Sequence, residues 1–309
     1  MKKFSIVSGC FNEAGNIEDL VARVSKVMNA LPQYDYEQIL IDNASKDGTQ
    51  EILRELAASN PKLKVILNAR NFGHIRSPFH GILQGSGEAV IFLASDLQEP
   101  PELIPEFIEK WEKGAKAVVA IKDSSDESPI FFAIRRFYYS VVDRLADTKT
   151  IQNFTGFGLY DRVIIEYCRS LNEPYPYFRG LIAEIGLPVE KVSYHQPLRT
   201  RGFTKNNFYT LYDMAMLGIT NFSKVPLRLA AMLGFATALL CLLVALGYLV
   251  YKILFWNNFP VGTAPLVIGL FFFASVQLLF IGILGEYIGA IHTQVLKRPL
   301  VVEKERINF

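Results

Sequence analysis

The chain has 309 residues, of which half are hydrophobic and a fifth are charged, and its formal net charge is only +2. A charge so close to neutral excludes a nucleic-acid-binding protein that works through bulk positive charge. The cysteines Cys10, Cys168 and Cys241 lie far apart and form no C-x-x-C pair. This spacing indicates neither a zinc site nor a disulfide framework, so we expect a reducing compartment such as the cytoplasm.

Residues 1–125 alternate between strand-like and helix-like segments. Short apolar runs bounded by turn residues predict strands, and apolar residues three and four positions apart predict helices between them. The predicted strands are Phe4–Cys10, Glu37–Ile41, Lys64–Leu67, Ala89–Leu93 and Ala117–Ile121. The predicted helices cover residues 17–31, Gln50–Ala58, Ile75–Gln84 and Glu102–Trp111. Strands that alternate with helices form a parallel sheet with helices on both faces, so the sequence predicts an α/β fold.

Polar side chains follow the first four predicted strands at the points where those strands end. They are Asn12 and Glu13, Asp42 and Asn43, Arg70 and Asn71, and Asp96 and Gln98. The carboxyl ends of parallel strands meet at one edge of the sheet, where such folds bind their ligands, so we expect these side chains to lie together. Asn and Asp also cap helices and start turns, which is an alternative explanation for each pair taken alone.

The chemistry of this edge suggests a particular class of ligand. The sequence contains neither G-x-x-x-x-G-K-[ST] nor G-x-G-x-x-G, which excludes a P-loop and a dinucleotide fingerprint. Asp96 and Gln98 offer hard oxygen ligands that, with water and phosphate oxygens, suit Mg²⁺ or Mn²⁺ on a diphosphate. The sequence therefore predicts a nucleotide diphosphate as the ligand.

The C-terminal third contains the uncharged runs Leu229–Tyr251 and Phe259–Gly285. Each run is long enough to cross a hydrocarbon core of about 30 Å as a helix. Lys and Arg residues flank the outer ends of the pair and are scarce between them, which predicts that both ends are cytoplasmic. The chain starts without the apolar h-region of a signal peptide, so the N-terminal domain is also expected in the cytoplasm.

These features predict a cytoplasmic domain over residues 1–225, a two-helix transmembrane region over 226–292 and a cytoplasmic tail over 293–309. Within the domain, Phe131–Leu145 mixes aromatic residues with three arginines. That composition fits either a helix at the membrane interface or an ordinary helix on the domain surface.

Several short motifs occur together along the chain. They are Phe11–Glu13, Asp42–Thr49, Arg70–Gly73, Ser95–Pro105, Phe178–Leu181 and Arg201–Lys205, followed by Leu284–Gly289 before Lys297-Arg298-Pro299. As a set they resemble the inverting, GT-A-fold glycosyltransferases of family 2. Within that family they are most similar to the membrane-bound polyprenyl-phosphate glycosyltransferases, which include dolichol-phosphate mannosyltransferase and bacterial two-span enzymes.

The resemblance implies a fold, an activity and a location. The fold would be a Rossmann-like, mostly parallel α/β sheet followed by interfacial helices and two transmembrane helices. The activity would be transfer of a sugar, with inversion, from a nucleotide diphosphate sugar to polyprenyl (undecaprenyl) phosphate on the cytoplasmic leaflet of the plasma (inner) membrane. UDP-glucose and UDP-N-acetylhexosamine are the favoured donors, ahead of GDP-mannose. The resemblance also implies Mg²⁺ or Mn²⁺ as cofactor. Related two-span enzymes can form tetramers, so a homo-oligomer is one expected state.

The resemblance also implies roles for individual residues. The nucleotide sugar would be held by Asn12, Glu13, Asp42, Asn43, Asp47, Arg70, Asn71 and Asp96. Asp96 and Gln98 would hold the metal and, with Arg201, act in catalysis. The acceptor phosphate would be bound by Arg179, Arg199, Arg201 and Lys205. Arg and Lys suit that role because both bind phosphate oxygens.

The sequence departs from the family pattern at several positions. Ala94 stands where family members have the first Asp of Asp-x-Asp, and Gly156 and Gly158 replace the Asp and Arg of a G-D-F-R motif. Asp42-Asn43-Ala44-Ser45 replaces the usual D-D-G-S. These changes fit either a subfamily with another donor or a membrane-anchored nucleotide-sugar-binding scaffold that has lost turnover. A processive polysaccharide synthase is excluded, since neither tryptophan lies in a Q-x-x-R-W motif.

Overall fold

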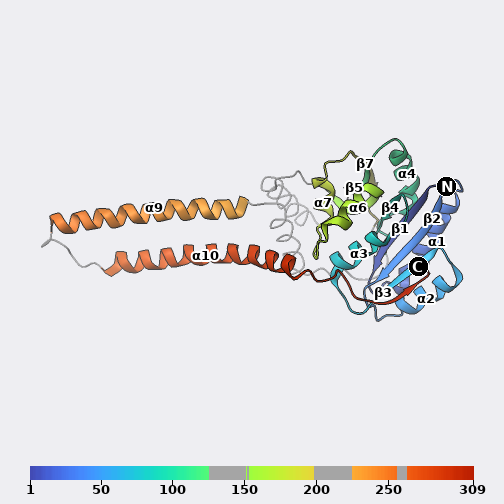
Figure 1. Cartoon of the computed structure of the whole chain (residues 1–309), viewed down its shortest axis with the longest axis horizontal. Coiled ribbons are helices and arrows are strands. Elements are labelled where there is room, and N and C mark those ends of the chain that lie inside the picture. Colours follow the sequence, from blue (N-terminus) through green and yellow to red (C-terminus); the bar gives the residue numbers. More distant parts are fainter. Residues whose placement is uncertain (125–150, 152, 198–224, 256–262) are drawn as a thin grey trace.

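The computed structural model describes residues 1–124, 151, 153–197, 225–255 and 263–309, which form an α/β domain and a pair of long helices that projects from it (Figure 1). The predicted helix over 131–145 lies outside the described residues, as do Arg199, Arg201 and Lys205. The roles predicted for these residues therefore stay predictions.

The domain is built on one eight-stranded sheet in the order β7-β5-β6-β4-β1-β2-β3-β8. The strands are β1 (Lys3–Cys10), β2 (Asp35–Asp42), β3 (Leu63–Asn68), β4 (Ala89–Phe92), β5 (Ala117–Ser124), β6 (Phe154–Asp161), β7 (Val189–His195) and β8 (Glu303–Ile307). The predicted strands are all present, and the α/β class is confirmed. The sheet is mixed, because β6 inserts antiparallel between β4 and β5, and β8 is antiparallel to β3.

Helices cover both faces of the sheet. They are α1 (Ala14–Asn29), α2 (Thr49–Ser59), α3 (Gly73–Gln84), α4 (Ile104–Glu112), α6 (Arg162–Leu171) and α7 (Phe178–Glu184), with a 3₁₀ turn η1 (Pro101–Leu103) before α4. On one face α1, α2 and α4 contribute Leu20 and Phe107 among other core residues, and on the other face α3, α6 and α7 contribute Phe79 and Ile165. Burial of each such side chain stabilises the fold by about 1.5–3 kcal/mol.

The predicted polar pairs meet at one edge of the sheet, as expected. The parallel register places Cys10 beside Asp42 and Asp42 beside Leu67, and β4 ends next to β1. Because β6 runs in the opposite direction, its first residues also lie at this edge, next to the end of β4. The carboxyl edge therefore brings together the segments that follow β1, β2, β3 and β4 and the start of β6.

The helices α9 (Val225–Leu254) and α10 (Thr263–Leu296) run side by side away from the domain (Figure 1). At 30 and 34 residues they are about 45 Å and 51 Å long. Both expose large apolar side chains, among them Phe235 on α9 and Leu266 on α10. In the described part of the chain one helical stretch, Phe272–Leu296, has the length and mean hydropathy of a membrane span. The second predicted span remains a proposal.

The residues after α10 return to the domain and add β8 to the sheet beside β3. Glu305 pairs with Arg54 at 2.8 Å, and the Asn308 amide donates to the carbonyls of Ala57 and Leu63, each at 2.8 Å. The segment that the sequence presents as a tail over 293–309 thus contains a strand of the sheet. Both ends of the helix pair are therefore attached to the same domain.

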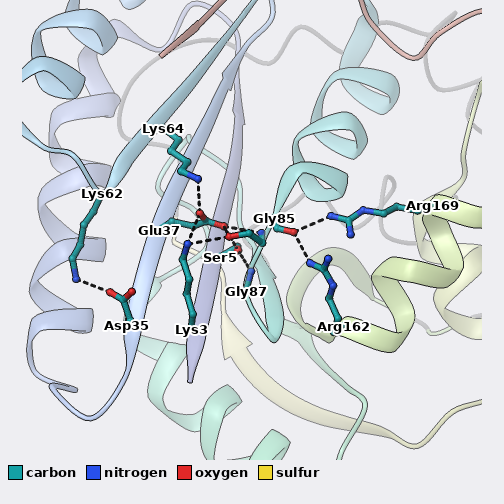
Figure 2. Close-up of polar contacts among 11 residues, drawn as sticks. Lys3, Ser5, Asp35, Glu37, Lys62, Lys64, Gly85, Gly87, Arg162 and Arg169 are labelled. Atoms are coloured by element: carbon teal, nitrogen blue, oxygen red, sulfur yellow. Dashed lines mark hydrogen bonds and ion pairs between the residues drawn. The ribbon is translucent and has the colours of Figure 1, made fainter. Parts of the chain in front are cut away.

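A buried carboxylate fastens the opposite, amino-terminal edge of the sheet (Figure 2). Glu37 accepts hydrogen bonds from Ser5 Oγ at 2.6 Å and Ser86 N at 2.7 Å, and pairs with Lys64 Nζ at 2.8 Å and Lys3 Nζ at 2.9 Å. Burial alone would raise the pKa of Glu37, but these donors outweigh it and lower the pKa to about 2. The network holds the turn between α3 and β4, and so fixes where β4 begins.

We expect Glu37→Gln to lower the free energy of unfolding by about 2 kcal/mol at pH 7, because two lysines lose their buried counter-charge. The folded-state pKa lies below the ordinary 4.5, so the wild-type advantage should be complete above pH 4.5 and disappear as the pH falls toward 2. Denaturant unfolding of the detergent-solubilised chain measures both effects. Glu88→Gln, at an exposed neighbouring carboxylate, is the control. An equal loss in the two variants would contradict this account.

Candidate functional site

The loops after β1 and β2 hold each other in place through hydrogen bonds. Asn12 adopts a left-handed backbone conformation, with φ of 54°, and its N–H donates to Ser45 Oγ at 2.7 Å. Its side-chain oxygen accepts from Lys46 N at 2.9 Å. The N–H of Glu13 donates to Thr49 Oγ1 at 3.0 Å. Asn12 therefore stabilises a turn, which was the alternative explanation for this residue. The turn nevertheless joins two loops of the candidate site.

Asp47 adds a fixed negative charge to these two loops. Its carboxylate accepts from the N–H of Ala14 at 3.2 Å, at the start of α1, and from Thr49 Oγ1 at 2.5 Å. Burial would raise the pKa of Asp47, but the bonds from Thr49 and Ala14 lower it overall. The group is thus a carboxylate at neutral pH, and it fixes the position of the first turn of α1.

Asp42 is the clearest candidate for contact with a ligand at this edge. It is fully buried, and its Oδ2 accepts from Gln50 Nε2 at 2.8 Å and Ser45 N at 3.0 Å. Its Oδ1 is buried and has no hydrogen-bond partner in the described part of the chain. Because a buried acceptor without a donor is costly, Oδ1 is suited to a donor group of a bound ligand.

Asn43 and Asn71 hold the turn after β3 against the end of β2. The Asn43 side chain accepts from the N–H of Phe72 at 2.8 Å and donates to Asn71 Oδ1 at 2.9 Å and the Gly73 carbonyl at 3.1 Å. This bonding gives Asn43 an observed role in positioning the start of α3. Arg70 beside this turn is exposed and lies over the Phe72 ring at 4.0 Å. Nucleotide contacts by these residues stay predictions.

The loop after β4 presents Asp96 at the same edge. Leu97 takes a left-handed conformation with φ of 61°, and the N–H of Gln98 donates to Asp96 Oδ1 at 3.2 Å. Ser95 ties this loop to β1 by donating to the Gly9 carbonyl at 2.9 Å. The Gln98 amide nitrogen donates to the Pro197 carbonyl at 3.1 Å. Asp96 and Gln98 thus lie together on a loop that is fastened at both sides.

Glu99 supports this loop through hydrogen bonds, a role that the sequence did not predict. The side chain is buried, and its two oxygens accept from Ala94 N at 2.6 Å and Thr155 Oγ1 at 2.7 Å. Burial raises the pKa of Glu99 to about 7, and the charge of Asp96 adds to the increase. Glu99 therefore connects the Asp96 loop to the start of β6. No local pattern marks it, because its partner Thr155 is distant in sequence.

The described residues contain no group of three or more His, Cys, Asp or Glu side chains that could hold a metal ion. Asp96 and Gln98 supply one carboxylate and one amide oxygen on a single loop. Mg²⁺ is commonly bound by one or two carboxylates together with substrate phosphates and water. The residues present therefore fit an ion that is held mainly by a diphosphate.

A cavity of about 320 Å³ is lined by residues of α3, α7 and the adjoining ends of β4 and β6. Arg179 lies in its lining, and its Nη1 donates to the Phe154 carbonyl at 3.4 Å. Thr155 and Gly156 also line the cavity, and Thr155 contacts Glu99. Of the four predicted acceptor residues, the structure describes Arg179, which contacts the first residue of β6.

Comparison with known proteins assigns the chain to a family. The description Glycosyl transferase family 2 matches residues 5–168, more than half of the chain. The chain belongs to glycosyl transferase family 2, and it is a glycosyltransferase. It is 33% identical over 305 residues to a bactoprenol glucosyl transferase of Shigella phage SfII, covering 98% of each chain. It is 34% identical over 299 residues to an uncharacterized glycosyltransferase of Synechocystis sp., covering 96% of this chain and 93% of the other.

Among solved structures, glucosyl-3-phosphoglycerate synthase from Mycobacterium tuberculosis, in complex with uridine diphosphate, matches with a TM-score of 0.48 and 18% identity. The match covers 71% of this chain and 78% of that one. The family resemblance inferred from the sequence motifs is confirmed by the family match and by the relatives that span nearly the whole chain.

We expect Glu99→Ala to loosen the Asp96 loop, because the Ala94 N–H loses a buried acceptor worth at least about 1.4 kcal/mol, a tenfold change. Hydrogen exchange followed by mass spectrometry should show roughly tenfold faster exchange for a peptide that contains Ala94. Glu99→Gln keeps an acceptor oxygen and should largely preserve the wild-type rate. Unchanged exchange in Glu99→Ala would show that Glu99 does not support the loop.

Proposed function

We propose that this glycosyltransferase moves a sugar from a nucleotide diphosphate sugar to a polyprenyl phosphate at the cytoplasmic face of the plasma membrane. The observation that supports this most is the shared position of three features at one end of the domain. The Asp96 loop follows β4 at the carboxyl edge, and the cavity with Arg179 is lined by α3 and α7 and the ends of β4 and β6. Figure 1 shows α3 and α7 on the side of the domain from which the apolar helices α9 and α10 project. Relatives named bactoprenol glucosyl transferases support a polyprenyl acceptor.

The nucleotide part of the donor would lie over the loops after β1, β2 and β3. The free Oδ1 of Asp42 would accept a hydrogen bond from it, and the exposed Arg70 would contribute positive charge near its phosphates. Asn12, Glu13, Asn43, Asp47 and Asn71 would shape this surface. UDP-glucose and UDP-N-acetylhexosamine are the donors we propose first, and the glucosyl relatives favour the former.

A divalent ion, Mg²⁺ or Mn²⁺, would be held by Asp96 and Gln98 together with the diphosphate. When bound, the ion supplies positive charge that stabilises the departing diphosphate. Asp96 is the one carboxylate that the Asp-x-Asp position retains, since Ala94 replaces the other. The hydrogen bond from Gln98 N orients the Asp96 carboxylate on its loop.

The acceptor would attack without help from a protein base. The second pKa of a phosphate ester is about 6, so the acceptor oxygen is largely ionised at neutral pH. This oxygen forms a bond to the anomeric carbon while the bond from that carbon to the diphosphate oxygen breaks, and the nucleoside diphosphate leaves with the electron pair. Such a direct displacement inverts the anomeric centre. Gly156, in place of the family Asp, is compatible with this chemistry.

Two anionic groups must come together in this step, which requires fixed positive charge. Arg179, with Arg199, Arg201 and Lys205 from the segment between β7 and α9, would bind the acceptor phosphate. Both α9 and α10 would cross the membrane, which keeps the domain and the C-terminal strand on one side. Assembly into a homo-tetramer is a further prediction from the resemblance.

The alternative function is a membrane-anchored scaffold that binds nucleotide sugar without turnover. Ala94 and Gly156 motivate it, because each replaces a carboxylate that the family usually carries. Release of nucleoside diphosphate on addition of lipid phosphate distinguishes the enzyme from the scaffold.

The purified chain should release nucleoside diphosphate and form a lipid-linked sugar when undecaprenyl phosphate is added with one of UDP-glucose, UDP-N-acetylglucosamine or GDP-mannose. Removal of divalent ions with EDTA should abolish the reaction. Asp96→Asn should lower kcat by about 10²-fold or more, since metal and preorganised charge contribute several kcal/mol to such transition states. Glu106→Gln, at an exposed carboxylate on α4, should behave as the wild type. Donor binding without release in the wild type would support the scaffold.

The two-span topology is tested by cysteine labelling in intact cells. Phe255 follows the last residue of α9, at the end of the helix that points away from the domain. Phe255→Cys should react with a membrane-impermeant thiol reagent added outside the cell. Lys304→Cys, exposed on β8, should react only after lysis. The parent chain, with its own cysteines, gives the background. Labelling of Phe255→Cys only after lysis would overturn the topology.

A further inference from the structure

The cavity between α3 and α7, introduced above as part of the site, has walls made mainly of carbon. Ile75, Pro78 and Phe79 of α3 contribute to the walls, together with Phe178 of α7, whose ring centre lies 5.8 Å from that of Phe79, and the ring of Phe92 at the end of β4. Its volume of about 320 Å³ lies within the range of small-molecule sites, about 300–1,000 Å³. Such a surface gains free energy by covering an apolar group, at about 25 cal/mol per Å².

The polar residues of the lining are His74, Thr155, Tyr177 and Arg179. Thr155 already donates its hydroxyl hydrogen to Glu99. Arg179 lies beside the ring of Tyr177, at 5.3 Å from its centre, and its guanidinium brings a permanent positive charge to the cavity. A hexose needs a hydrogen-bond partner for each hydroxyl that it buries, whereas an apolar chain that ends in an anion needs carbon walls and one cation. Because most of the lining residues are apolar and Arg179 carries the positive charge, the lining fits the second description better than the first.

Gly156 lines this cavity and adds neither a side chain nor a charge to it. Its φ of 108° is a conformation that favours glycine, and a Cβ built there would lie at ordinary van der Waals distance, 3.6 Å, from the Phe92 ring. A carboxylate at this position, as in the family pattern, would stand in the cavity and repel an anion near Arg179. The glycine therefore suits an anionic ligand with an apolar body.

The cavity also lies at the end of the domain from which the long helices project. Figure 1 shows α3 and α7 on the side of the domain that faces α9 and α10. The guanidinium of Arg76, on α3, donates to the carbonyl of Pro299, three residues after the end of α10. A lipid that lies along these helices would therefore meet the side of the domain that holds the cavity, and Thr155 connects the cavity through Glu99 to the Asp96 loop.

We propose that this cavity binds the isoprene unit next to the phosphate of the acceptor lipid, with Arg179 on the phosphate. This inference rests on the proposed transfer to a polyprenyl phosphate. If the inference holds, Ile75, Phe92 and Phe178 determine which acceptor is used. The enzyme should then prefer a branched isoprenyl phosphate over a straight alkyl phosphate, because the cavity covers the branch methyl.

The kinetic test fills the cavity with a larger side chain. Ile75→Trp should raise the KM for farnesyl phosphate by about tenfold or more and change the KM for the nucleotide sugar by less than twofold, since a misfit of a methylene or more in an apolar pocket costs this much. The wild type should use farnesyl phosphate better than dodecyl phosphate, and Ile75→Trp should reduce that preference. Val163→Trp, which adds the same ring on the exposed surface of α6, is the matched control.

A milder variant guards against misfolding. Ile75→Ala removes carbon from the cavity wall without overpacking it. The ratio of kcat/KM for farnesyl phosphate to that for dodecyl phosphate should fall, and the melting temperature should stay near that of the wild type. If Ile75→Trp raises the donor KM instead, the cavity binds the sugar and the inference is wrong. If both KM values are unchanged, the acceptor does not enter the cavity.

A binding test that needs no turnover separates this inference from the proposed function. A farnesyl phosphate that carries a photoreactive group on its first isoprene unit should crosslink to residues 75–79 or 176–179, and excess undecaprenyl phosphate should suppress the crosslink. Crosslinks confined to α9 and α10 would overturn the inference even if the enzyme is active. Crosslinks in the cavity without any sugar transfer would support the binding site and contradict the proposed function.

Discussion

The parallel pairing of β1 with β2 and β4 is the constraint on which the candidate site depends. Its register ends the strands side by side, so the loops that follow them meet and bond to one another. Asn12 then binds Ser45, and Ser95 binds the carbonyl of Gly9. At the other edge of the sheet the Glu37 network fixes the start of β4. Contacts before and after β4 thus fix the position of the Asp96 loop. They compensate for the shortness of β4, which has only four residues.

The helix pair and the sheet also depend on each other. The chain leaves the domain into α9 and returns from α10 into β8, which pairs with β3. Several side-chain contacts secure this return, including His80 with Glu303 at 2.6 Å and Arg54 with Glu305 at 2.8 Å. Because α3 carries His80 and also lines the cavity, the wall of the cavity is held by the segment that follows the apolar helices. This arrangement favours a fixed position of the cavity relative to the helix pair over free rotation on a tether.

Much of the fold was predictable because its signals are local. Apolar runs and helical spacing predicted β1 to β5 and α1 to α4, and strand ends predicted where Asp42 and Asp96 would meet. The parts that were missed depend on distant partners. β8 has the sequence Glu-Lys-Glu-Arg-Ile, whose charges are not typical of a strand. It is stabilised by main-chain pairing with β3, an ion pair with α2 and a hydrogen bond with α3. Glu37 and Glu99 are carboxylates that sequence composition would place on the surface, and only folding supplies the donors that allow their burial.

The departures from the family pattern fit the observed geometry when each is considered with its neighbours. At Ala94 a side-chain carboxylate is missing, but the backbone N–H there is held by Glu99, so the loop keeps its support while Asp96 supplies the charge. At Gly156 the missing carboxylate leaves an apolar cavity whose charged lining residue is the cation Arg179. A phosphate acceptor arrives already ionised, so a base at 156 would add repulsion without removing a needed proton. Loss of these two carboxylates is therefore compatible with turnover on an anionic acceptor.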